Sequence, residues 1–116
     1  MLFAVAVVQG VYYLLTGIWP LVSIRTFMMV TGPKTDLWLV KTVGVLVTTI
    51  GVTLLVAAGR DEIGVQTLVL AVGSAAALTA IDVIYVAKRV ISPIYLADAA
   101  PEIALIAWWA IAWTIS

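Results

Sequence analysis

Apolar runs long enough to cross a lipid bilayer are the feature of this sequence that most limits its fold. A hydrocarbon core about 30 Å thick is crossed by roughly 20 helical residues. Such runs occur at Leu2–Val22, Leu37–Ala58, Ile63–Ala87 and Pro93–Ile115. Because lipid offers the backbone no hydrogen bonds, each run is predicted to be a helix. The expected fold is all-α, one antiparallel four-transmembrane-helix bundle over residues 1–116.

The start of the fourth run decides where two acidic residues lie. Its uninterrupted apolar part, Ile103–Ile115, rises only about 20 Å, which is too short to span. The Ser92-Pro93 pair is a good helix start, because serine caps and proline tolerates the first helical position. A helix from there places Asp98 and Glu102 inside the span, one turn apart on one face. The alternative ends the membrane at Glu102 and leaves Tyr95–Ala100 as an interfacial segment.

Composition supports lipid as the solvent and excludes several kinds of site. The chain is 65% hydrophobic and 10% charged, whereas a soluble domain is about half apolar and about a quarter charged. Six basic residues balance six acidic ones, which gives no reason to expect a nucleic-acid partner. The absence of cysteine and histidine removes the usual ligands of iron–sulfur clusters, haem and thiolate metal sites. We therefore expect no cofactor, no metal and no catalytic residues.

Charge asymmetry predicts an orientation. Arg60 is the only basic side chain expected on one side of the membrane. The other side carries the remaining five, which are Arg25, Lys34, Lys41, Lys88 and Arg89. Short cytoplasmic loops are enriched in lysine and arginine. Residues 23–36 and 88–91 are therefore predicted to be cytoplasmic loops, with both termini outside. The first run lacks the basic segment and cleavage site of a secretory signal, so we expect it to be a retained helix.

A polar or small-residue stripe follows one face of each predicted helix, and lipid would drive these stripes inward. The predicted turns bring residues from three of the stripes to the cytoplasmic half, where they form a candidate proton, cation or ligand site. Its members are Glu102, Asp98, Asp82, Lys41, Tyr95 and Tyr85. Acidic residues inside a membrane often mark ion pathways. The structural alternative is that Lys41 pairs with Asp82 or Asp98 and holds the helices together.

Small residues recur at spacings that suit close helix packing. In lipid, such surfaces let two helix backbones approach, and this packing replaces the hydrophobic drive of water-soluble folds. The residues predicted to pack in this way are Gly10, Gly17, Gly44, Gly51, Gly73 and Ala77. The same surfaces would also suit a partner subunit, and the sequence does not separate the two uses.

Two segments carry a resemblance to known proteins. They are Gly32–Gly44, GPKTDLWLVKTVG, and Ile91–Asp98, ISPIYLAD. Both resemble a group of small bacterial four-helix membrane proteins, which in layout are similar to the DoxX-like set. The resemblance implies the four-helix fold and a bacterial cytoplasmic (inner) membrane location. It implies no activity and no catalytic residues.

Three functions fit these features. The first interpretation is a non-enzymatic accessory or structural subunit that packs against other membrane subunits or against its own copies, favoured by the small-residue faces and the absence of a nucleophile–base pair. The second is a small oligomeric proton- or cation-coupled transporter or channel that uses Glu102 and Asp98. The third is a pocket for a lipid or another apolar ligand, with Tyr13 and Trp109 as walls and acid–base chemistry open to the acidic residues.

Overall fold

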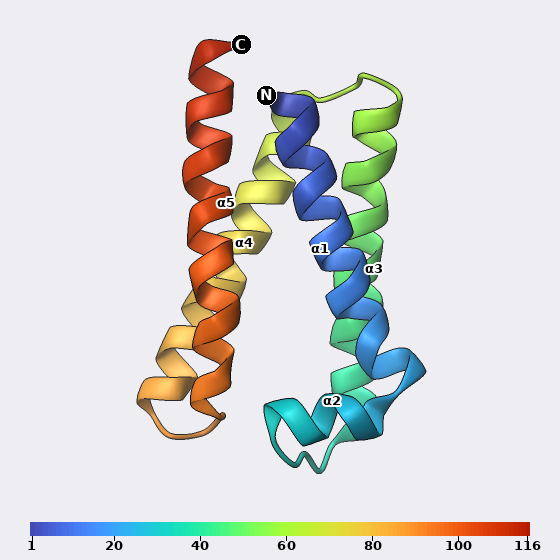
Figure 1. The fold of residues 1–116 in the computed structure, drawn as a ribbon, viewed down its shortest axis with the longest axis vertical. Coiled ribbons are helices and arrows are strands. Elements are labelled where there is room, and N and C mark those ends of the chain that lie inside the picture. Colours follow the sequence, from blue (N-terminus) through green and yellow to red (C-terminus); the bar gives the residue numbers. More distant parts are fainter.

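The computed structural model describes every residue from Met1 to Ser116, and all of its regular elements are helical. Figure 1 shows their order along the chain. The elements are α1 (Leu2–Val22), α2 (Ile24–Thr31), α3 (Leu37–Gly59), α4 (Val65–Ala87), the 3-10 turn η1 (Pro93–Tyr95) and α5 (Leu96–Ile115). Four helical spans, formed by α1, α3, α4 and the continuous η1–α5 segment, are long and apolar enough to cross a membrane. The prediction of four such helices is confirmed.

The fourth span begins at Pro93, as the Ser92-Pro93 pair predicts. The Ser92 hydroxyl oxygen accepts a hydrogen bond from the backbone N–H of Ile94 at 3.3 Å. One 3-10 turn then leads into α5, and Pro101 lies inside α5 without ending it. Asp98 and Glu102 are therefore helical residues of the fourth span.

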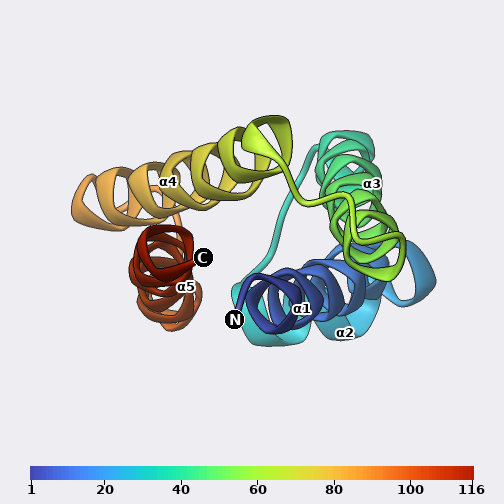
Figure 2. The same ribbon diagram turned by 90° about the horizontal axis from the view of Figure 1, so that it is seen from above.

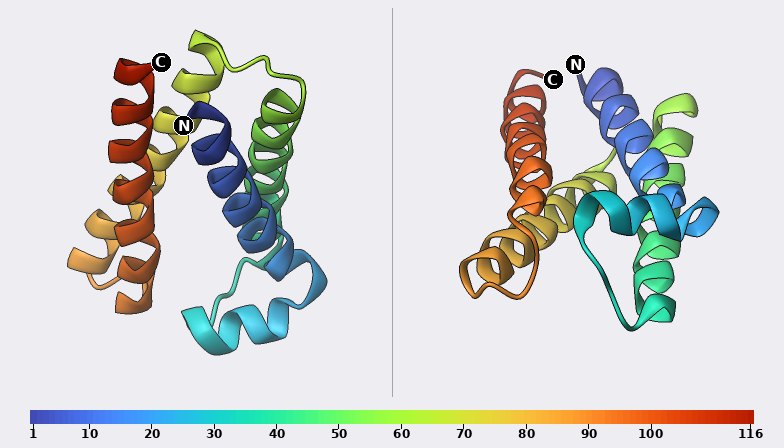
Figure 3. Two further views of the ribbon diagram at one scale, coloured as in Figure 1. Left: turned by 45° about the horizontal axis from the view of Figure 1, so that its top comes forward. Right: turned by 60° about the horizontal axis from the view of Figure 1, so that its bottom comes forward.

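A short helix, α2, occupies part of the predicted loop 23–36. The Ser23 side chain caps it by accepting from the backbone N–H of Thr26. The Trp19 ring on α1 fixes its position, since Trp19 Nε1 donates to Thr26 Oγ1 at 3.0 Å and the ring meets Phe27 edge-on at 5.3 Å. Figure 3 shows α2 lying across the end of the molecule away from the termini. This cap and these contacts explain a helix that eight residues alone would not sustain.

The spanning helices form two pairs, α1 with α3 and α4 with α5, and the most extensive packing is within each pair. Figure 1 shows the pairs diverging toward the end that carries α2, and Figure 2 shows them as separate groups when seen from above. Contact between the pairs comes mainly from α1 against α5 and, less, from α3 against α4. This divergence creates the space in which the candidate site lies.

Glycines bring α1 and α3 into backbone contact. A Cβ atom on Gly17 would lie 2.7 Å from the carbonyl oxygen of Gly44, and one on Gly51 would lie 2.7 Å from that of Gly10. These four glycines therefore pack at the α1–α3 contact, where small residues let helices approach in lipid. A Cβ atom on Gly73 in α4 would meet nothing within 4 Å outside its own helix, and both Gly73 and Ala77 are exposed. The last two predicted packing residues thus lie on an exposed face of α4.

The hydrophobic core lies at the end that holds the two termini. Its centre is Trp109, which is completely buried among side chains from α1, α3, α4 and α5. The other members are Val5, Ala6, Leu54, Ala58, Ala71, Leu105 and Ala112. The opposite half of the molecule has no comparable core. The fold is therefore tightly packed at one end and hollow at the other.

Candidate ligand-binding site

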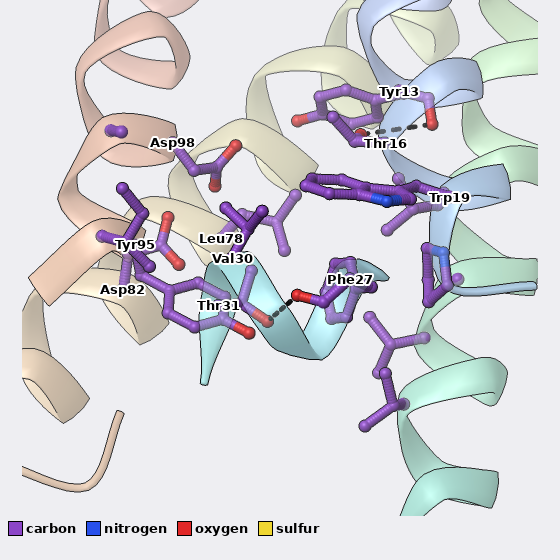
Figure 4. A pocket seen from close by; sticks show the side chains of 18 of the residues that line it. Tyr13, Thr16, Trp19, Phe27, Val30, Thr31, Leu78, Asp82, Tyr95 and Asp98 are labelled. Atoms are coloured by element: carbon purple, nitrogen blue, oxygen red, sulfur yellow. Dashed lines mark hydrogen bonds between the residues drawn. The ribbon is translucent and has the colours of Figure 1, made fainter. Parts of the chain in front are cut away.

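A cavity of about 510 Å³ occupies the hollow half of the molecule. Every helix contributes to its wall, and Figure 4 shows it from close by. The carboxyl groups of Asp82 and Asp98 lie on one side of that view, while Trp19 and Phe27 lie on the other. Much of the remaining lining is aliphatic, with Val43, Val47, Leu78 and Ile94 among its members. The cavity thus combines apolar walls with an acidic end.

Two tyrosines of α1 hold two acidic residues of α5. The Tyr12 hydroxyl donates to Asp98 Oδ1 at 2.5 Å, and the Tyr13 hydroxyl donates to Glu102 Oε1 at 2.6 Å. Adjacent residues on one helix reach acceptors one turn apart on the other. Tyr13 and Glu102 are fully buried, with exposed fractions of 1% and 0%. These bonds fix the acidic side chains at the point where the two helix pairs meet.

Two carboxyl oxygens at the acidic end have no hydrogen-bond partner. They are Asp82 Oδ2 and Glu102 Oε2, and both are buried. Asp82 is 4% exposed and projects from α4 into the cavity, as Figure 4 shows. A buried polar atom without a partner costs about 1–3 kcal/mol, and more when it carries charge. The acidic end is therefore a place where a hydrogen-bond donor would be stabilised.

The predicted cluster of charged residues forms only in part. Asp82, Asp98, Glu102 and Tyr95 all line the cavity. Lys41 is exposed, lies outside the cavity and makes no ion pair. Its predicted pairing with Asp82 or Asp98 is absent, because Lys41 lies on a face of α3 that does not line the cavity. Tyr85 also lies outside, where Lys88 Nζ is 5.7 Å from the centre of its ring.

The basic residue of the cavity is Lys34, from the segment between α2 and α3. Its Nζ lies 5.1 Å from the centre of the Tyr95 ring and 5.8 Å from that of Phe27. It also donates to the carbonyl oxygens of Thr31 and Gly32, at 3.4 and 3.3 Å. No ion pair joins it to a carboxylate, since the only ion pair of the chain links exposed Arg60 and Glu62. The three acidic residues therefore have no cation within 4 Å.

Gln9 bounds the packed end just beyond the acidic residues. Its Oε1 accepts from Trp109 Nε1 at 2.6 Å, and its Nε2 donates to the carbonyl oxygen of Ala71 at 3.0 Å. One buried amide thereby joins α1 to both α4 and α5. Trp109 belongs to this network and to the core, and it does not line the cavity.

Sequence reasoning missed the contributions of Tyr12, Trp19, Phe27 and Lys34. Helical periodicity placed Tyr13 on the inward stripe of the first helix, and its neighbour Tyr12 falls about 100° away. The other signal was the short sequence between α1 and α3, in which Ser23 can cap a helix. Nothing in that segment alone shows that it folds over a cavity.

Metal binding has no support in this arrangement. No group of three or more acidic side chains is placed to hold a metal ion. What the cavity offers is a set of acceptor oxygens, several aromatic rings, one ammonium group and aliphatic walls.

No protein-family model, curated protein or solved structure matches this chain.

Proposed function

We propose that this chain is a multi-pass membrane protein that binds a small, mainly apolar molecule in the cavity between its two helix pairs. The observation that carries this proposal is the cavity itself. Its volume of about 510 Å³ lies within the range of about 300–1,000 Å³ that is usual for small-molecule sites. Apolar walls with a few converging polar groups are also typical of such sites.

Unpaired acidic groups support a binding role over a packing defect. Protein interiors are close-packed, and the voids that remain empty are usually apolar. This cavity instead holds two buried carboxyl oxygens without partners, on Asp82 and Glu102. Such groups are costly inside a membrane protein and commonly mark functional sites. A bound molecule would compensate this cost.

Access to the cavity is available from the surface. Val30, Val43 and Ile94 line the cavity and are also exposed, by 51%, 53% and 42%. In a bilayer, a molecule dissolved in the lipid would meet Val43, which lies on the spanning helix α3. We therefore infer that the ligand enters from the membrane.

A cavity-filling substitution tests this function. Val47 lines the cavity, whereas Val45 on the same helix is exposed and lies outside it. The chain is purified in mild detergent, and small molecules are extracted and identified by mass spectrometry. We expect the wild type and Val45→Trp to retain a compound that Val47→Trp has lost. Identical extracts from all three proteins would contradict the proposal.

The proposed setting is a bacterial inner membrane, with an antiparallel bundle and both termini outside. Support comes from the five basic residues in or beside the two connections, α1 to α3 and α4 to α5, that Figure 1 shows at one end. The chain has no cysteine, so single cysteines at exposed Thr35 and Asp61 report each side cleanly. In intact bacterial cells, a membrane-impermeant thiol reagent should label Asp61→Cys and spare Thr35→Cys. The reverse pattern would exclude this orientation.

An accessory subunit role is a second candidate function, favoured by one surface. Exposed small residues follow one face of α4, namely Gly73, Ala76, Ala77 and Ala80, and such faces pack helices in lipid. Native mass analysis after mild extraction should then find the chain with a partner or with copies of itself, and Ala77→Leu should separate them. A monomer in every preparation would count against this role.

A further inference from the structure

We propose that the ligand of the cavity carries a protonated amine on an apolar body, with the ammonium group between Asp82 Oδ2 and Glu102 Oε2. This inference rests on the proposed binding function and names the class of its ligand. Three features support it: the unpaired acceptors, the charge balance of the cavity wall, and an ammonium group that the chain itself already places there.

Hydrogen-bond capacity favours a donor. Asp82 Oδ2 and Glu102 Oε2 are buried acceptors without partners, while the second oxygen of Glu102 is already occupied by the Tyr13 hydroxyl. A purely apolar ligand would leave both oxygens unpaired. An ammonium group has several N–H donors and no acceptor, so one such group can serve both carboxyl groups. Charge-assisted bonds of this kind are among the stronger ones in proteins.

Charge balance favours a cation. The wall carries three acidic residues and one basic residue, Lys34, which lies more than 4 Å from every carboxylate oxygen. An anionic ligand would meet repulsion at the acidic end. A bare metal ion would lack a ready set of ligands, since no three acidic side chains are placed to hold one. An organic cation requires only the two oxygens that are free.

Lys34 shows that the cavity accommodates an alkylammonium group. Its Nζ lies over the rings of Tyr95 and Phe27, at 5.1 and 5.8 Å. Both rings line the cavity, and aromatic faces attract cations at such distances. The Lys34 side chain is thus a tethered example of the proposed ligand chemistry within the same cavity, beside the Tyr95 ring. Its charge also opposes entry of a second cation, so its removal should strengthen ligand binding.

Two probes of the same shape separate the cation from the apolar body. They are 2-phenylethylammonium and propylbenzene, in which a methyl group replaces the ammonium. Each probe is titrated into the full chain in phosphatidylcholine nanodiscs and its binding is followed by calorimetry. The same titration with the Val47→Trp protein, whose cavity is filled, gives the background from partitioning into lipid. We expect the cation to bind about tenfold more tightly than propylbenzene, as a charged hydrogen bond provides.

Variants assign the preference to individual atoms. Asp82→Asn and Glu102→Gln should each weaken the binding of 2-phenylethylammonium about tenfold and leave the binding of propylbenzene unchanged. Asp82 Oδ2 makes no hydrogen bond within the chain, so Asp82→Asn breaks no existing bond at that atom. Asp61→Asn, at an exposed site, is the matched control and should change the affinity for neither probe. Lys34→Gln should strengthen the binding of the cation about threefold, whereas Lys88→Gln, at an exposed site, should leave it unchanged.

The outcomes distinguish this inference from the function on which it rests. Equal affinities for the two probes, with loss of both in Val47→Trp, would overturn the amine assignment and leave an apolar binding site. Unchanged cation affinity in both Asp82→Asn and Glu102→Gln would also overturn it. If neither probe binds the wild type more tightly than it binds the Val47→Trp protein, the cavity takes up neither probe and the amine assignment is overturned. The extraction experiment then decides the binding function separately.

Discussion

At the scale of single residues, the Tyr13 hydroxyl is the contact on which the buried end of the site depends most. It provides the hydrogen bond to Glu102, whose other carboxyl oxygen has none. Tyr13→Phe would leave both oxygens of a buried carboxyl group unpaired, so we expect a loss of about 1–3 kcal/mol in unfolding free energy. Reversible unfolding in mixed micelles, followed by circular dichroism, measures this loss.

Tyr85→Phe is the control for this prediction. Tyr85 is 36% exposed, and its hydroxyl makes no hydrogen bond within the chain. The same chemical change there should alter the unfolding free energy by less than about 0.5 kcal/mol. Equal losses in the two variants would show that the Tyr13–Glu102 bond adds nothing to stability.

At the scale of helices, two glycine contacts set the distance between α1 and α3. A Cβ on Gly17 would lie 2.6 Å from the backbone nitrogen of Thr48, and one on Gly51 would lie 2.7 Å from that of Leu14. Backbone atoms cannot move aside singly, so the helices must separate. We expect Gly17→Ala and Gly51→Ala each to cost about 1–3 kcal/mol in the same unfolding assay.

Gly73→Ala is the matched change on α4. No atom lies within 4 Å of the added methyl group, and alanine is the better helix former by about 0.5–1 kcal/mol. This variant should therefore be as stable as the wild type or more so. A destabilised Gly73→Ala protein would reveal a packing contact that the single chain does not contain, as an assembly would provide.

At the scale of the whole molecule, the buried amide of Gln9 ties the two helix pairs together. Gln9 lies on α1 and forms hydrogen bonds with the Trp109 ring on α5 and with the Ala71 carbonyl on α4. Gln9→Leu roughly keeps the side-chain volume and removes both hydrogen bonds, leaving the Trp109 N–H buried without an acceptor. We expect a loss of about 1–3 kcal/mol, measured in the same micelles, together with a shift of tryptophan fluorescence.

Gln66→Leu provides the comparison, because Gln66 is exposed near the start of α4. It should leave both stability and the fluorescence spectrum unchanged. If Gln9→Leu behaves like Gln66→Leu, the two pairs are held together by core packing around Trp109 alone.

The helix positions could be predicted from the sequence because helices in lipid satisfy their own backbone hydrogen bonds. The predicted and observed boundaries differ by at most two residues, with α3 ending at Gly59 and α4 beginning at Val65. The start at Pro93 followed from span length and a local cap. The unexpected element was α2, whose helix is stabilised by Trp19, a residue outside it.

What the sequence by itself determined are the four apolar spans, the acidic residues carried inside the last two, and the glycines able to bring helices close. Only the tertiary structure decided that Tyr12 and Tyr13 bond Asp98 and Glu102, that Lys34 rather than Lys41 lines the cavity, and that Gly73 is exposed. The physical reason is the range of the interactions. Hydropathy and caps act within one helix, whereas the rotation of each helix and the divergence of the two pairs are set by packing between residues distant in the chain.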